Sequence, residues 1–186
     1  MRRCILYILL IFPSYLISQH TERFIELTKV LTKTDTKIES IYYGNGNIYF
    51  INEYSTYKYG DSITGNYTGK SYVYYRNGHI ANETTQDDYG NYLLVKIYDR
   101  KGNLTQERIT TEIDNRADNI SDYLRNETYG DFKKIINYYK YSRKLKRWYK
   151  HKVEYLTLKK RQFTSIKEFL SPTGEIYKTK KREYGE

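Results

Sequence analysis

The segment SYVYYRNGHI, residues 71–80, decides the fold. Its first half is dense in aromatic and β-branched residues, which is typical of a β-strand. The pair Asn77-Gly78 follows and favours a tight turn. Both residue types adopt positive φ more readily than other residues, and primed hairpin turns require positive φ because their twist matches that of the flanking strands. The segment therefore predicts a β-hairpin with a primed turn.

Three other segments repeat this unit, which consists of an aromatic residue, several polar residues, a glycine, one further residue and then Ile or Leu. They are YGNGNI at 43–48, YDRKGNL at 98–104 and, more loosely, FLSPTGEI at 169–176. The four predicted turns contain Gly46, Gly78, Gly102 and Gly174. A lone hairpin is marginal in water, and about three strands with a shared apolar face are needed for stability. The sequence therefore predicts a mainly all-β fold, an irregular antiparallel sheet of successive β-hairpin repeats.

The segment YYRNGHI at 74–80 resembles the MORN-variant repeats of bacterial proteins, in which "YY-x-NG-x-I/L" hairpins are stacked in series. The unit at 98–105 is equally similar to the YD repeats of cell-surface proteins. The resemblance covers roughly residues 38–110, with a return at 169–184. It implies a chain of β-hairpins and, since MORN-variant repeats occur in surface, periplasmic and toxin-neutralising proteins, contact with another protein. The four glycines are unevenly spaced, so an irregular sheet is expected rather than a regular solenoid.

Two segments leave their secondary structure open. Residues 20–31 suit a short helix behind a Thr21 cap, but they also suit an opening strand. Residues 132–149 place apolar side chains at helical spacing, whereas 136–141 and 153–158 are dense in strand-forming residues. Strands are favoured for the second segment, because hairpins already dominate the preceding part of the chain.

Residues 1–18 are typical of a secretory signal peptide. Arg2 and Arg3 precede an apolar run at 4–16, and the small Ser18 precedes polar residues. An uncleaved membrane anchor is the alternative, but the run is short against the ~20 residues of a bilayer span. We expect export to the periplasm, the cell surface or the exterior, and a single β-rich domain at 19–186. The one Cys lies in the leader, so the mature chain would have no internal disulfide, which favours a bacterial envelope.

Charge is distributed unevenly over the chain, which carries a formal +10 from 32 Lys and Arg against 22 Asp and Glu. Between Lys133 and Arg182 there are 17 bases and three acids, a net charge of +14. The remaining 15 bases and 19 acids give −4. The mature chain therefore divides into an acidic repeat region at 19–132 and a basic, Tyr-rich end at 133–186.

The basic end supplies the candidate binding residues, in which rings and cations alternate. They are Tyr138, Tyr139, Tyr141, Arg143, Lys144, Lys146, Arg147, Trp148, Tyr149 and Lys150. Cations that contact phosphates and rings that stack on bases would suit nucleic acid, but no known nucleic-acid motif is present and the leader directs the chain away from the cytosol. We expect another protein or an anionic envelope component as the partner. A purely solvated face, in which Lys and Arg stems cover the sheet, is the alternative.

Catalytic and cofactor motifs are missing. The three His and the acidic residues show no metal-ligand spacing, and the glycines form neither a nucleophile elbow nor a phosphate-binding loop. We therefore expect no cofactor, no metal and no enzymatic activity. The predicted function is that of an exported binding protein. An envelope protein that binds anionic lipid or polysaccharide is the first alternative, and a small secreted toxin or hydrolase is the second.

Overall fold

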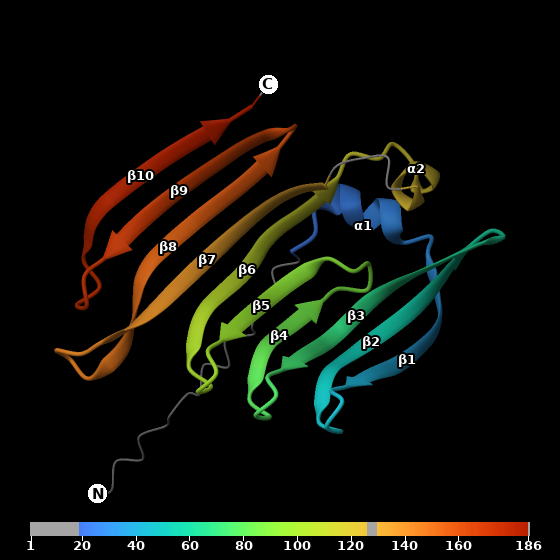
Figure 1. The fold of residues 1–186 in the computed structure, drawn as a ribbon. Coiled ribbons are helices and arrows are strands. Elements are labelled where there is room, and N and C mark those ends of the chain that lie inside the picture. Colours follow the sequence, from blue (N-terminus) through green and yellow to red (C-terminus); the bar gives the residue numbers. More distant parts are fainter. Residues whose placement is uncertain (1–18, 126–129, 186) are drawn as a thin grey trace, which may run out of the picture.

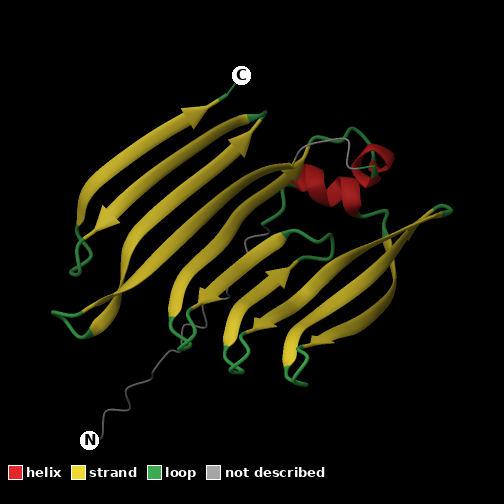
Figure 2. Cartoon of the chain, viewed as in Figure 1, coloured by secondary structure: helices red, strands yellow, loops and turns green. Residues whose placement is uncertain are grey.

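The computed structural model describes residues 19–125 and 130–185, and about 66% of these residues are in strands. The predicted leader at 1–18 lies outside the described residues. Ten strands form one antiparallel sheet, which confirms the all-β prediction (Figures 1 and 2). They are β1 Thr32–Tyr42, β2 Ile48–Tyr59, β3 Ser62–Tyr74, β4 Ile80–Gln86, β5 Tyr92–Tyr98, β6 Leu104–Asn115, β7 Gly130–Ser142, β8 Arg147–Lys159, β9 Gln162–Leu170 and β10 Ile176–Tyr184.

The strands follow one another across the sheet in the order of the sequence, from β1 at one edge to β10 at the other. Each pair is antiparallel and is joined by a short connection, except that a longer segment with a helix links β6 to β7. The segment whose secondary structure the sequence left open forms β7 and β8. Its Tyr, Ile and Val residues alternate between the two faces of the sheet, which explains why strand propensity prevails over helical spacing.

The four predicted glycines lie in hairpin turns at one end of the sheet (Figure 1), but these turns are not primed. Gly78 has φ +84°, whereas Asn77 does not have positive φ. The amide of Gly78 donates to the carbonyl of Tyr75 at 2.9 Å, and the amide of Tyr75 donates to the carbonyl of His79 at 2.8 Å. This is a three-residue loop that ends in a left-handed glycine bulge. The turns at 43–47, 87–91, 99–103 and 171–175 have the same hydrogen bonds.

Two-residue turns occur at the opposite end of the sheet, where the sequence did not predict them. Gly60, with φ +56°, begins the turn between β2 and β3. Lys160 and Arg161, at φ +51° and +62°, form the turn between β8 and β9. Positive φ at both central residues is the geometry of a primed turn, here adopted by two side chains that disfavour it.

Neighbouring glycine turns are fastened to one another. The Tyr43 hydroxyl donates to the carbonyl of Tyr74 at 2.6 Å, and the Tyr75 hydroxyl donates to the carbonyl of Tyr98 at 2.8 Å. In the third turn Asp99 occupies the equivalent place and accepts hydrogen bonds from within its own turn instead. The donors are the Asn103 side chain and the amides of Asn103 and Lys101. Of these, the Asn103 side chain contributes most to holding the pKa of Asp99 below its usual value. The series of tyrosine-linked turns therefore ends at Asp99.

Two short helices, α1 Glu22–Thr28 and α2 Ile120–Leu124, lie together beyond the β4–β5 turn (Figure 1). Thr21 caps α1, because its hydroxyl accepts from the amide of Phe24 at 3.2 Å, so the helical alternative for 20–31 is correct. Phe24 is 1% exposed and contacts the rings of Tyr89 and Tyr123. The main apolar core therefore lies at this end, under the helices.

The segment before α1 is joined to the middle of the sheet. The amide of Thr21 donates to the carbonyl of Ile113 in β6 at 3.0 Å, and the amide of Ile113 donates to the carbonyl of Gln19 at 2.6 Å. His20 pairs with Asp87 of the β4–β5 turn at 2.6 Å. We call this junction of residues 19–21 with β6 the clasp.

Candidate functional site

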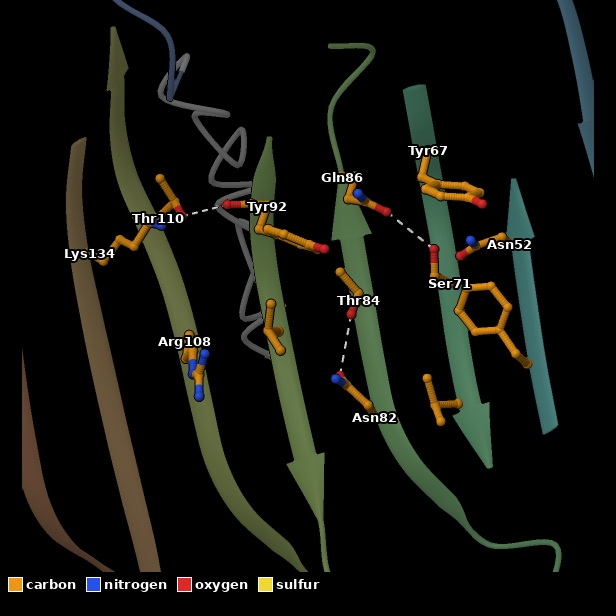
Figure 3. Close-up of a pocket in the computed structure, with 13 residues that line it drawn as sticks. Asn52, Tyr67, Ser71, Asn82, Thr84, Gln86, Tyr92, Arg108, Thr110 and Lys134 are labelled. Atoms are coloured by element: carbon orange, nitrogen blue, oxygen red, sulfur yellow. Dashed lines mark hydrogen bonds between the residues drawn. The ribbon is translucent and has the colours of Figure 1, made fainter. Parts of the chain in front are cut away.

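A groove of about 470 Å³ opens on one face of the sheet, across β2–β7 (Figure 3). We call this face the groove face. Its lining combines aromatic rings, amide and hydroxyl side chains, and two cations. The lining residues are Phe50, Asn52, Tyr67, Ser71, Val73, Asn82, Thr84, Gln86, Tyr92, Val95, Arg108, Thr110 and Lys134. Such convergence of rings with a few polar groups is typical of ligand sites.

Strand register builds the groove floor from side chains that lie directly opposite one another. Ser71 of β3 faces Thr84 of β4, which faces Val95 of β5. Ser71 donates a hydrogen bond to Gln86 Oε1 at 3.2 Å, and Thr84 donates to Asn82 Oδ1 at 3.3 Å. These bonds fix the two amide groups, so their orientation is set before any ligand arrives.

The same register continues across β6–β10 and gathers cations on the groove face. Arg108 of β6 lies opposite Ile136, which is followed across the sheet by Glu154, Lys167 and Lys180. Side chains alternate between faces along a strand, so the residues two positions before and after each of these also lie on the groove face. They form the neighbouring rows of paired side chains across the sheet. Together the three rows hold seven bases, which we call the cationic field: Arg108, Lys134, Lys152, Lys167, Lys178, Lys180 and Arg182.

Glu154 is the one acid on the groove face of these five strands, all of which the structure describes. It is 7% exposed and accepts hydrogen bonds from Ser165 at 2.8 Å and Tyr138 at 3.0 Å. Its Oε1 lies 3.1 Å from the Lys167 ammonium. Burial would raise the pKa of Glu154, but these three partners outweigh burial and hold it below its usual value. Glu154 therefore stays ionised and neutralises part of the field.

The other cations of the field are less well compensated. Arg108 and Lys134 form no ion pair with any residue that the structure describes. Burial lowers the pKa of Lys134, and the charge of Arg108 lowers it further. Burial also lowers the pKa of Lys152, whose ammonium lies 3.5 Å from the centre of the Tyr138 ring. The field therefore retains unneutralised positive charge.

The opposite face of the same strands is different. Lys133 pairs with Glu112, and the Lys181 ammonium lies 2.6 Å from a carboxylate oxygen of Glu183. Glu107 and Glu168 accept hydrogen bonds from tyrosine hydroxyls on this face. A row of apolar side chains crosses it between the charges, formed by Leu94, Ile109, Ile135, Tyr155 and Ile166. Charge on this face is balanced, whereas charge on the groove face is not.

The residues predicted from the sequence as one binding surface are divided by the strand geometry. Tyr138 faces the groove side, where it contacts Glu154, and the adjacent Tyr139 faces the opposite side, where it donates to Glu107 at 3.4 Å. Tyr149 pairs with Lys140, whereas Tyr141 and Trp148 form an edge-on ring pair 6.2 Å apart.

The remaining predicted residues lie toward the turn between β7 and β8. Arg143, Lys144 and Lys146 are in that turn, Lys150 pairs with Tyr139, and the Arg147 guanidinium donates to the carbonyl of Pro172 at 3.3 Å. The ten residues therefore form no single surface.

Sequence reasoning missed most of the groove and of the cationic field. Arg108 lies in the part of the chain classified as acidic, and the groove residues Tyr67, Asn82 and Gln86 precede the basic end altogether. The adjacent pairs Lys133–Lys134 and Lys180–Lys181 are visible in the sequence. Only the pairing register shows that Lys134 and Lys180 lie on the same face of the sheet. That register depends on bulges which the sequence does not mark.

The part of the chain at residues 19–125 and 130–185 contains no group of three or more His, Cys, Asp or Glu side chains placed to hold a metal ion. It also contains no helix with the length and apolar character needed to cross a membrane.

No model of a known protein family, no curated protein and no solved structure matches this chain. The resemblance to MORN-variant and YD repeats therefore stays a prediction from the motif residues alone.

Proposed function

We propose that this protein is a non-enzymatic binding protein that holds an anionic macromolecule on the groove face of its sheet. The observation that carries the proposal is the segregation of charge, with seven bases and one acid in three neighbouring rows on one face of β6–β10. Unpaired cations packed together repel one another and reduce stability, so an anion that neutralises them is bound favourably.

Two pairs of lysines that are adjacent in the sequence, Lys133–Lys134 and Lys180–Lys181, provide the test. Lys134→Gln with Lys180→Gln removes two charges from the groove face, and Lys133→Gln with Lys181→Gln removes two from the opposite face of the same strands. Both double variants have the same net charge. Binding of fluorescent poly-L-glutamate, polygalacturonate and polyphosphate would be measured by anisotropy at 50 mM NaCl and again at 300 mM.

We expect at least one polyanion to bind at 50 mM NaCl and to weaken at 300 mM, because salt screens the contact. The groove-face variant should weaken binding about tenfold, at about 0.7 kcal/mol for each charged contact. The opposite-face variant should bind like the parent. Equal weakening by both variants, or no binding of any of the three polymers, would contradict the proposal.

A protein with an acidic surface is the second candidate partner. The exposed rings of Tyr67 and Tyr92 beside the groove favour it, since tyrosine offers a large contact area at low entropic cost. In the same experiment, a preference for poly-L-glutamate over the other polymers would support this candidate.

A further inference from the structure

The chemistry of the groove points to sugar rings as part of the ligand. Resting on the proposed function, we infer that the anionic partner is a linear acidic polysaccharide. Its sugar rings would lie in the groove, and its carboxylates would extend over the cationic field. Three features of the groove support this inference.

The first feature is a pair of exposed aromatic rings on the groove face. Tyr67 of β3 is 44% exposed and Tyr92 of β5 is 54% exposed (Figure 3). Phe50 and Tyr54 meet the Tyr67 ring edge-on, at centroid distances of 6.4 and 5.5 Å, and hold it in place. The flat face of such a ring packs against the C–H face of a pyranose, through apolar contact and weak C–H···π attraction.

The second feature is a pair of oriented amide groups on β4, the strand between the two strands that carry these rings. The oxygens of Asn82 and Gln86 accept from Thr84 and Ser71, whereas the amide nitrogens donate to no residue that the structure describes. Every solvent-inaccessible side-chain nitrogen or oxygen in that part of the chain has a partner, so these two nitrogens, on residues that line the groove, keep contact with solvent. Each amide nitrogen carries two donors, which suit the neighbouring hydroxyl oxygens of a sugar.

The third feature is the continuity of the groove with the cationic field. Arg108 and Lys134 belong to both, so a chain that leaves the groove across the strands meets a cation at β6 and again at β7. Neighbouring strands lie about 4.8 Å apart, close to the length of one sugar residue in an extended chain. The field spans β6–β10, about 19 Å by the same spacing, which is longer than one lipid headgroup.

The test compares two polyanions that differ in backbone, using the full mature chain. Oligogalacturonate of about 15 residues supplies sugar rings and carboxylates, and poly-L-glutamate of equal charge supplies carboxylates alone. Binding of both is measured by calorimetry at 50 mM NaCl for the parent, Tyr92→Ala, Tyr92→Phe and the control Tyr42→Ala. Tyr42 is 59% exposed on β1 and does not line the groove.

We expect oligogalacturonate to bind about tenfold more tightly than poly-L-glutamate. Tyr92→Ala should weaken oligogalacturonate binding about fivefold, as expected for loss of one ring contact. Tyr92→Phe, which keeps the ring, and Tyr42→Ala should bind it like the parent. Poly-L-glutamate binding should be the same in all four proteins.

The outcomes separate the two proposals. Equal affinity for the two polymers, unaffected by Tyr92→Ala, would overturn the polysaccharide inference and leave the proposed function standing. Failure of both polymers to bind the parent would overturn the polysaccharide inference, and failure of polyphosphate as well would overturn the proposed function. Circular dichroism of each variant at 25 °C shows whether its sheet is intact. If Tyr92→Ala fails to fold, Tyr67→Ala removes the other exposed ring of the groove and should weaken oligogalacturonate binding by a similar factor.

Discussion

The two faces of strands β6–β10 are made from the same stretch of sequence and differ in charge. On the groove face the bases lie together, and a single buried carboxylate, Glu154, partly compensates them. On the opposite face each of Lys133 and Lys181 has an acidic partner. Adjacent residues in the sequence thus experience opposite electrostatic environments.

For a β protein, net charge along the sequence is therefore a poor guide to the distribution of charge in space. The basic end was identified as one region, but half of its side chains point away from the other half. A surface made from alternate residues of several strands emerges only once the register is fixed.

Replacing Glu154 should have the largest effect on stability. Glu154→Ala removes the buried partner of Lys167, Ser165 and Tyr138, and we expect the free energy of unfolding to fall by about 3 kcal/mol. The matched change Glu168→Ala removes an exposed acceptor on the opposite face and should cost about 0.5 kcal/mol. Urea unfolding of both variants checks this. Similar losses in the two variants would mean that the faces do not differ.

Alkaline pH should reduce stability partly through Tyr138. Burial, together with the hydrogen bond to Glu154 and its charge, raises the pKa of Tyr138 to about 12, whereas the unfolded value is about 10. The neutral phenol stabilises the fold fully below pH 10, and this contribution is lost as pH rises toward 12. Tyr138→Phe should therefore cost about 1 kcal/mol at pH 8 and progressively less above pH 10. A difference from the parent that stays constant from pH 8 to pH 12 would contradict this.

Lys134 and its neighbour Lys133 should respond in opposite directions. Lys134→Met removes a half-buried cation beside Arg108, so the free energy of unfolding should rise by about 0.5 kcal/mol. Lys133→Met breaks the pair with Glu112 and should lower it by a similar amount. Thermal and urea unfolding would measure both. A loss of stability in Lys134→Met would show that the field is not self-repelling.

Salt should have the smallest effect. Raising NaCl from 50 to 500 mM screens repulsion within the cationic field, and the parent should gain about 0.3 kcal/mol. The variant with Lys134→Gln and Lys180→Gln should gain less than the variant with Lys133→Gln and Lys181→Gln. The three salt dependences, compared by urea midpoint, show which face carries the repulsion.

Much of the fold could be predicted from the sequence. The glycines at 46, 78, 102 and 174 lie in hairpin turns, because positive φ is cheap for glycine and the flanking residues favour strands. The turn type was predicted wrongly. Asn77-Gly78 suits a two-residue primed turn, but in this chain a hydrogen bond from Tyr75 to His79 closes a loop one residue longer. The hydrogen bonds of the Tyr75 and Asn77 side chains to the next turn contribute to that choice, and they join residues 23 apart.

The candidate site was much harder to predict. Tyr67, Asn82 and Gln86 are common polar strand residues with no motif of their own, and they meet only through pairing of β3 with β4 and β5. The sequence did indicate contacts between tyrosine rings and basic side chains. The structure shows one of them, in which the Lys152 ammonium lies over the ring of Tyr138. Strand propensity can be read from a residue, but the face of the sheet on which its side chain lies is set only when the strands pair.

The clasp divides the sheet into two parts that should unfold at different stages. Because residues 19–21 are bonded to β6, strands β1–β5 lie inside a closed loop of chain, whereas β8–β10 lie outside it and end at an open edge. Under a pulling force β10 would peel away first, then β9, one row of backbone bonds at a time, while the enclosed strands would hold until the clasp gave way. Backbone amides should accordingly exchange with solvent deuterium fastest at the β10 edge, on which part of the cationic field is built.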